Sequence, residues 1–186
     1  MKTIKKILID SISMKDLLLN KYVLIDTCFL SALQKYPSRF EDLLANLNEH
    51  SEGLCVNPLI RLEYLRIAKN AEEKSRIENS LDKFPTLPLE GNVLEEVERI
   101  YPLYNLCQSI RNNKQVSLVD AYAVAYLNTY TPRLLFLTFD NGDFPLEILD
   151  RISTGAIDVK TQIFTWGLYQ INHEKLAKLK KIYTGI

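Results

Sequence analysis

Five acidic residues stand beside the predicted strands and helices of this chain, where a sheet could bring their carboxylates together: Asp26, Glu63, Asp120, Asp140 and Asp143. The first directly follows the apolar run 22–25, and the last two follow the apolar run 133–137. Glu63 lies in the second turn of a predicted helix, and Asp120 lies in the first turn of the helix that leads into 133–137. Ligands of open α/β sheets bind outside the carboxyl ends of the strands. We therefore expect these acids to converge on one end of the sheet.

A cluster of carboxylates at one place needs a compensating cation. Two unit charges about 5 Å apart repel by roughly 3 kcal/mol at an effective dielectric constant of about 20. Oxygen ligands without histidine or cysteine select hard ions, so the cluster predicts Mg²⁺ or Mn²⁺. Two such ions can activate a water and stabilise the leaving oxygen in phosphodiester hydrolysis.

Each acid is also compatible with a purely structural role. Asp26 is placed to cap the helix that follows it, and Asp120 completes a capping box with Ser117. Glu63 fits a surface position on its helix, and the remaining two acids flank an Asn-Gly turn. Asp26 and Asp120, however, stand beside strongly apolar runs, where an unpaired charge is expensive. Their combination favours a shared functional site.

Composition and charge narrow the class of protein. The 186 residues include 23 Lys plus Arg against 23 Asp plus Glu, a balance that argues against non-specific coating of polyanions. With 47% apolar and 25% charged residues, the chain is typical of a globular domain that can bury a core. No apolar run approaches the ~20 residues of a membrane span, so no membrane partner is expected. Asp10 interrupts the apolar stretch near the start, which argues against a signal peptide. The Lys-rich stretch 175–181 favours a solvated helix face over a binding patch.

The cysteines indicate a reducing compartment. Cys28, Cys55 and Cys107 are odd in number and lack CxxC spacing, so neither a disulfide framework nor a zinc site is predicted. We therefore expect a cytoplasmic protein.

Strands and helices alternate along the chain. Short apolar runs predict strands over 22–25, 53–56 and 133–137. Helical spacing predicts helices over about 29–48, from 58 onward, over 69–83, over about 93–112 and over 117–130. This order is typical of an α/β domain with a parallel sheet. We divide the chain into an N-terminal extension (1–20), the α/β domain (21–160) and a C-terminal helical tail (161–186).

Four segments of the chain resemble, in order and in spacing, the four motifs of PIN-domain nucleases: 24–30, 57–65, 117–125 and 137–144. The resemblance covers about residues 22–145, roughly two-thirds of the chain. It implies a three-layer α/β/α domain with a central parallel sheet. It also implies a metal-dependent RNA endonuclease.

The resemblance assigns site residues one by one. Asp26, Glu63 and Asp120 match the first three acids of the family. Asp140 matches the fourth, with Asp143 a second candidate for the same place. The hydroxyl residues Thr27 and Thr138 match those beside the first and fourth acids, where they would support the carboxylates.

The ending Thr-x-Asp-x-x-Asp-Phe and the length are closest to the VapC-type toxins of toxin–antitoxin pairs. That subgroup implies an RNA substrate, an antitoxin partner and self-association as a homodimer. The chain departs from it in the twenty or so residues before the first strand and the forty or so after Asp143. Two other functions stay open. One is a PIN-like module that binds RNA or protein without cutting. The other, a phosphatase with an aspartyl nucleophile, is disfavoured because Cys28 stands where its second aspartate would be.

Overall fold

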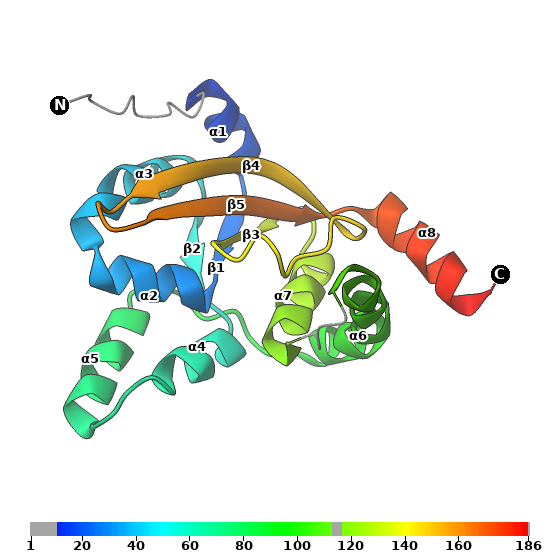
Figure 1. Ribbon diagram of the computed structural model, residues 1–186, viewed down its shortest axis with the longest axis horizontal. Coiled ribbons are helices and arrows are strands. Elements are labelled where there is room, and N and C mark those ends of the chain that lie inside the picture. Colours follow the sequence, from blue (N-terminus) through cyan, green and yellow to red (C-terminus); the bar gives the residue numbers. More distant parts are fainter. Residues whose placement is uncertain (1–10, 113–116, 186) are drawn as a thin grey trace.

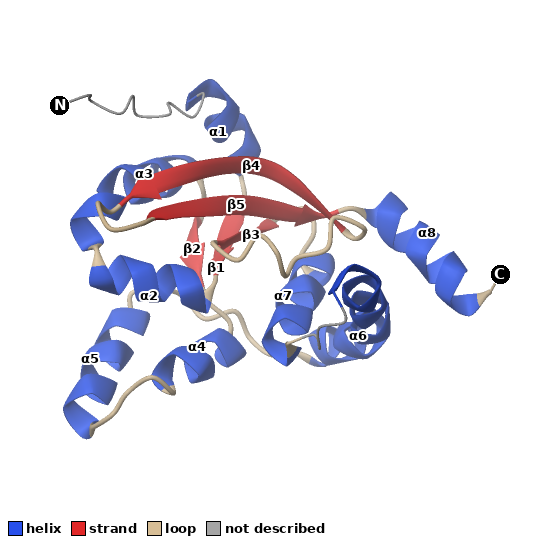
Figure 2. Ribbon diagram, viewed as in Figure 1, coloured by secondary structure: helices blue, strands red, loops and turns tan. Residues whose placement is uncertain are grey.

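A five-stranded mixed sheet lies at the centre of the protein (Figures 1 and 2). The computed structural model describes residues 11–112 and 117–185. Its strands are β1 (Tyr22–Ile25), β2 (Gly53–Cys55), β3 (Leu134–Thr138), β4 (Leu149–Asp158) and β5 (Ile163–Ile171), in the spatial order β2-β1-β3-β5-β4. The first three strands pair in parallel, whereas β5 pairs antiparallel with both β3 and β4. The predicted α/β fold with a parallel centre is confirmed, and the sheet also carries an antiparallel edge.

Eight helices surround the sheet in the described part of the chain: α1 (Ser11–Leu18), α2 (Thr27–Lys35), α3 (Pro37–His50), α4 (Pro58–Leu65), α5 (Ala71–Leu81), α6 (Gly91–Asn112), α7 (Leu118–Thr129) and α8 (His173–Thr184). Figure 1 shows α1 and α3 on one side of the sheet and α6 and α7 on the other. Covering both faces explains why the central strands are apolar throughout. All five residues of β3 are buried, as are three of the four in β1.

The single helix expected over about 29–48 is two helices. It breaks at Tyr36, which has non-helical backbone angles and is followed by Pro37. The α region is disfavoured for a residue before proline, and proline is well accepted at the first position of a helix. Pro102, in contrast, does not divide α6. Residues 84–89 belong to none of the five strands, and one isolated bridge joins Thr86 to Val56.

The expectation of a helical tail over 161–186 is wrong for its first half. Residues Ile163–Ile171 form β5, which lies between β3 and β4 inside the sheet, so the α/β domain continues past residue 160. Helix begins only at His173, after the N-cap Asn172. The reason is the composition of the strand, whose aromatic and aliphatic residues are largely buried, as in Trp166 and Leu168.

The N-terminal extension packs on the domain through α1. Met14 and Leu18 are buried, and α1 contacts α3. Residues 1–10 lie outside the described part of the chain.

Candidate active site

Asp26 stands where β1 ends and α2 begins, and its carboxylate is held from several sides. Oδ1 accepts a hydrogen bond from the Thr27 backbone N–H at 2.6 Å, which makes Asp26 the N-cap of α2. Oδ2 accepts from the Thr138 hydroxyl at 2.6 Å and from the Cys28 thiol at 3.0 Å. Only 8% of the residue is exposed. Burial raises the pKa of Asp26, the hydrogen bonds oppose that shift, and the charge of Glu63 adds to it.

Glu63 reaches the same place from α4. This helix starts with the N-cap Asn57, whose Oδ1 accepts from the Ile60 N–H at 2.8 Å, followed by Pro58. That start places Glu63 in the second turn, where its Oε2 accepts a hydrogen bond from the Thr27 hydroxyl at 2.5 Å. Thr27 therefore links the first acid to the second, because its backbone N–H bonds Asp26 and its hydroxyl bonds Glu63.

Asp120 lies in the first turn of α7, but it does not close a capping box. The N-cap Ser117 makes no side-chain capping hydrogen bond. Burial raises the pKa of Asp120 to about 8, and the charges of Asp26, Asp143, Asp140 and Glu63, in that order, add to the shift. The structure therefore brings the other four predicted acids within electrostatic reach of Asp120.

The turn after β3 supplies the remaining two acids. Thr138 is fully buried, and its hydroxyl accepts a hydrogen bond from the Asp140 N–H at 2.9 Å. Asp140 is largely exposed, but the partial burial of its carboxyl group and the charge of Asp143 both raise its pKa. The Asp143 carbonyl accepts a hydrogen bond from the hydroxyl of Tyr104, which lies on α6. Both alternatives for the fourth acid thus border the site.

Three residues at the site were not predicted from the sequence to belong to it: Cys28, Tyr104 and Asn141. Cys28 bonds Asp26, and its sulfur accepts the Phe139 N–H at 3.3 Å. Its place within the first motif, two residues after Asp26, was an available signal. Tyr104 gave none, because it is one of 10 tyrosines and meets the site only through folding. Asn141 was seen only as a turn residue between two acids, although its side chain binds β5.

The carboxylate oxygens of the five acids are the kind of ligand that hard divalent cations prefer. No lysine or arginine of the described residues pairs with four of these carboxylates: Asp26, Glu63, Asp120 and Asp140. Within residues 11–112 and 117–185, no three acidic, histidine or cysteine side chains are already grouped tightly enough to enclose an ion. Mg²⁺ commonly takes one or two direct carboxylates and keeps several waters, so a complete protein cage is not required.

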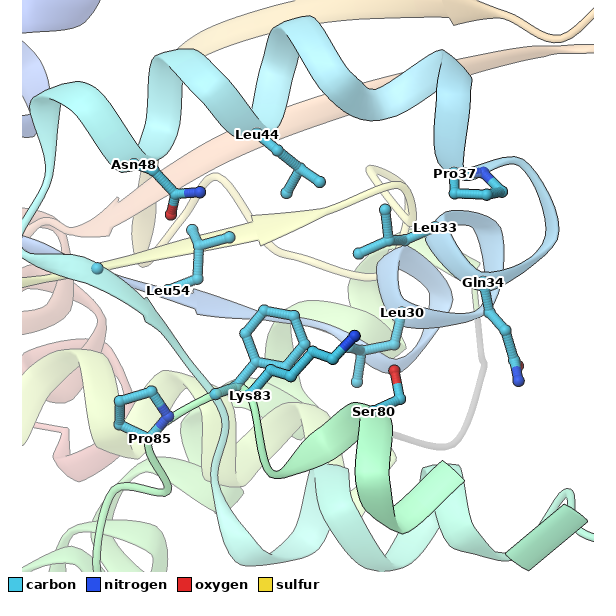
Figure 3. Close-up of a pocket in the computed structure, with 12 residues that line it drawn as sticks. Leu30, Leu33, Gln34, Pro37, Leu44, Asn48, Leu54, Ser80, Lys83 and Pro85 are labelled. Carbon is cyan, nitrogen blue, oxygen red and sulfur yellow. The ribbon is translucent and has the colours of Figure 1, made fainter. Parts of the chain in front are cut away.

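A separate cavity lies away from the acids. Its volume is about 560 Å³, and it opens between α2, α3, β2 and the segment after α5 (Figure 3). Its walls are mainly apolar, with Leu30, Leu33, Leu44, Leu54 and Phe84. None of the five acids lines it.

Comparison with known proteins agrees with the geometry. No curated protein gives a significant match to the sequence. Among the described residues, no helix is long and apolar enough to cross a membrane. The sequence model of the PIN domain family matches residues 23–144, about two-thirds of the chain, and spans all five acids. The chain therefore belongs to the PIN domain family, whose members are generally nucleases.

Proposed function

We propose that this protein is a Mg²⁺- or Mn²⁺-dependent RNA endonuclease. One observation carries the proposal: acids from three other segments act electrostatically on Asp120, and four of the five acids have no basic partner among the described residues. Such an arrangement is electrostatically unfavourable without a cation. We therefore infer that a cation binds between the acids. Because the chain belongs to a family of nucleases, we expect that cation to serve the hydrolysis of a phosphodiester bond.

The roles of the residues follow from their positions. Asp26, Glu63, Asp120 and Asp140 would hold the metal, with Asp143 as a further ligand. A bound divalent ion supplies an acidified water and stabilises the charge that develops on the leaving oxygen. The chain orients the ligands: Thr138 and Cys28 fix Asp26, and Thr27 fixes Glu63.

A VapC-type toxin is the more specific assignment. The ending from Thr138 to Phe144 and the length of the chain support it. It brings a cellular RNA as the substrate, an antitoxin that covers the acids and self-association as a homodimer. The odd number of cysteines and their lack of CxxC spacing support a reducing cytoplasm.

Cleavage of a mixed RNA pool tests the activity. With the purified full chain, we expect cutting in Mn²⁺ and in Mg²⁺, and none in excess chelator, because the carboxylates alone cannot activate water. Restoring the metal should restore cutting. No cutting with either metal, together with no Mn²⁺ binding by calorimetry, would exclude the nuclease and favour the non-catalytic binding module.

Loss of the Thr138 hydroxyl is expected to weaken the site without unfolding the protein. Thr138→Val keeps the shape but removes the donor to Asp26 and the acceptor of the Asp140 N–H. Loss of a residue that orients a metal ligand typically costs about 10- to 100-fold in affinity or activity. We expect that fall in the single-turnover cleavage rate. The control is Thr154→Val on β4, which removes a hydroxyl that donates to the Trp166 carbonyl of β5 at 2.8 Å. Equal rates for the two variants would contradict the supporting role of Thr138.

A further inference from the structure

The turn that carries the last two acids is tied to β5 by the side chain of Asn141. Its Nδ2 donates to the Thr165 carbonyl at 2.7 Å, and its Oδ1 accepts from the Tyr169 hydroxyl at 2.7 Å. Both partners belong to β5. Because the donor and the acceptor of one planar amide are engaged together, both the position and the orientation of the side chain are set.

Gly167 makes room for this tie. It pairs with Thr138, the last residue of β3, so it lies where the strand ends and the turn begins. A Cβ atom at this position would lie 2.3 Å from Asn141 Oδ1 and 2.6 Å from the ring of Tyr169. The Asn141 amide therefore lies directly against the backbone of β5, in space that a glycine leaves open.

Other contacts hold the same turn on either side of Asn141. The Asp140 N–H bonds the Thr138 hydroxyl at 2.9 Å, and the Asp143 carbonyl accepts from the Tyr104 hydroxyl. The turn is thus bound to β3, to β5 and to α6. Of these elements, β5 lies entirely beyond residues 23–144, the part that matches the family.

We propose that Asn141 is a positioning residue of the nuclease site, and that it acts through β5 by holding the turn so that Asp140 and Asp143 face Asp26 and Asp120. The inference rests on the proposed function. It adds that β5, outside the family match, is a working part of the site.

The test uses the full chain and Mn²⁺ alone as the probe. For Asn141→Ala we expect the Mn²⁺ dissociation constant, measured by calorimetry, to rise about tenfold or more, as is typical when a metal ligand loses its support. The cleavage rate at saturating RNA should fall with it. The control is Asn46→Ala, which removes an amide bonded to the Asp42 carbonyl at the same 2.7 Å on α3. The control should bind Mn²⁺ with the affinity of the wild type, while its melting temperature should change about as much as that of Asn141→Ala.

Tyr169→Phe provides a second measurement that keeps the ring in place. It removes the hydroxyl that donates to Asn141, so Mn²⁺ affinity should fall here too, by less than in Asn141→Ala. This variant decides the matter if Asn141→Ala fails to fold.

Two results would overturn the proposal. Mn²⁺ affinity within twofold of the wild type in Asn141→Ala and Tyr169→Phe, while the wild type binds Mn²⁺ and cuts RNA, would refute the positioning role alone. A wild type that neither binds Mn²⁺ nor cuts would refute the proposed function and this inference together.

Discussion

Asp26→Asn is expected to lower the rate of RNA cleavage by at least about 10³-fold, equivalent to roughly 4 kcal/mol in the barrier. Asp26 is the most enclosed acid of the site, with three hydrogen bonds to its two oxygens. An amide has the same shape but only one oxygen, and it carries no charge to offset a divalent ion. The NH₂ group of the asparagine would also replace an oxygen that accepts a hydrogen bond. It would face either the Thr27 N–H or the Thr138 hydroxyl, both of which donate to Asp26 in the wild type.

The measurement is single-turnover cleavage at saturating Mn²⁺, with calorimetry for the metal. Asp150→Asn is the matched control, because Asp150 is paired with Lys175 at 2.7 Å, away from the acids. We expect the control to cut RNA at the wild-type rate. If Asp26→Asn also retains a rate within tenfold of the wild type, Asp26 is not a ligand on which the reaction depends.

The features that were predictable from sequence depend on local signals. Strands β1 and β3 are short runs of mainly apolar residues. Asp26 directly follows β1, and Asp140 lies two residues after β3. Asn57 and Pro58 mark the start of α4, and that start fixes the turn in which Glu63 lies. Each of these signals is read within one element, and together they place the acids.

The features that were missed depend on contacts between distant parts of the chain. The bond from Tyr169 to Asn141 spans 28 positions, and that from Tyr104 to Asp143 spans 39. Neither pair has a local pattern that reveals it. Strand β5 was not predicted, because its residues were assigned to the same helical tail as the Lys-rich helix that follows it. Its place between β3 and β4 depends on pairing with other strands, which no local pattern reveals. The break before Pro37, in contrast, had a local signal that the helical spacing outweighed.

Asp120→Asn is expected to stabilise the metal-free protein at alkaline pH while removing activity. The folded chain raises the pKa of Asp120 from 3.8 to about 8, with burial as the main cause. A raised acid pKa means that the folded state holds its proton more tightly than the unfolded state does. Its contribution to the unfolding free energy is therefore complete below about pH 4 and is lost as pH rises toward about pH 8.

Asparagine imitates the protonated acid at every pH, so the variant avoids this loss. In chelator, the variant should exceed the wild type in unfolding free energy by about 2–4 kcal/mol at pH 8, with a smaller difference at pH 5. Urea unfolding at both pH values measures this. The variant keeps a residual pH slope, because the pKa values of Asp26 and Asp140 are also raised. If the difference in unfolding free energy between the two proteins is the same at pH 5 and pH 8, the folded state does not raise the pKa of Asp120.

Saturating Mn²⁺ should make the wild type the more stable of the two proteins, because a cation stabilises its ionised carboxylate and gains less from the amide of the variant. The acids that destabilise the empty protein are, on this account, the same ones that bind the metal.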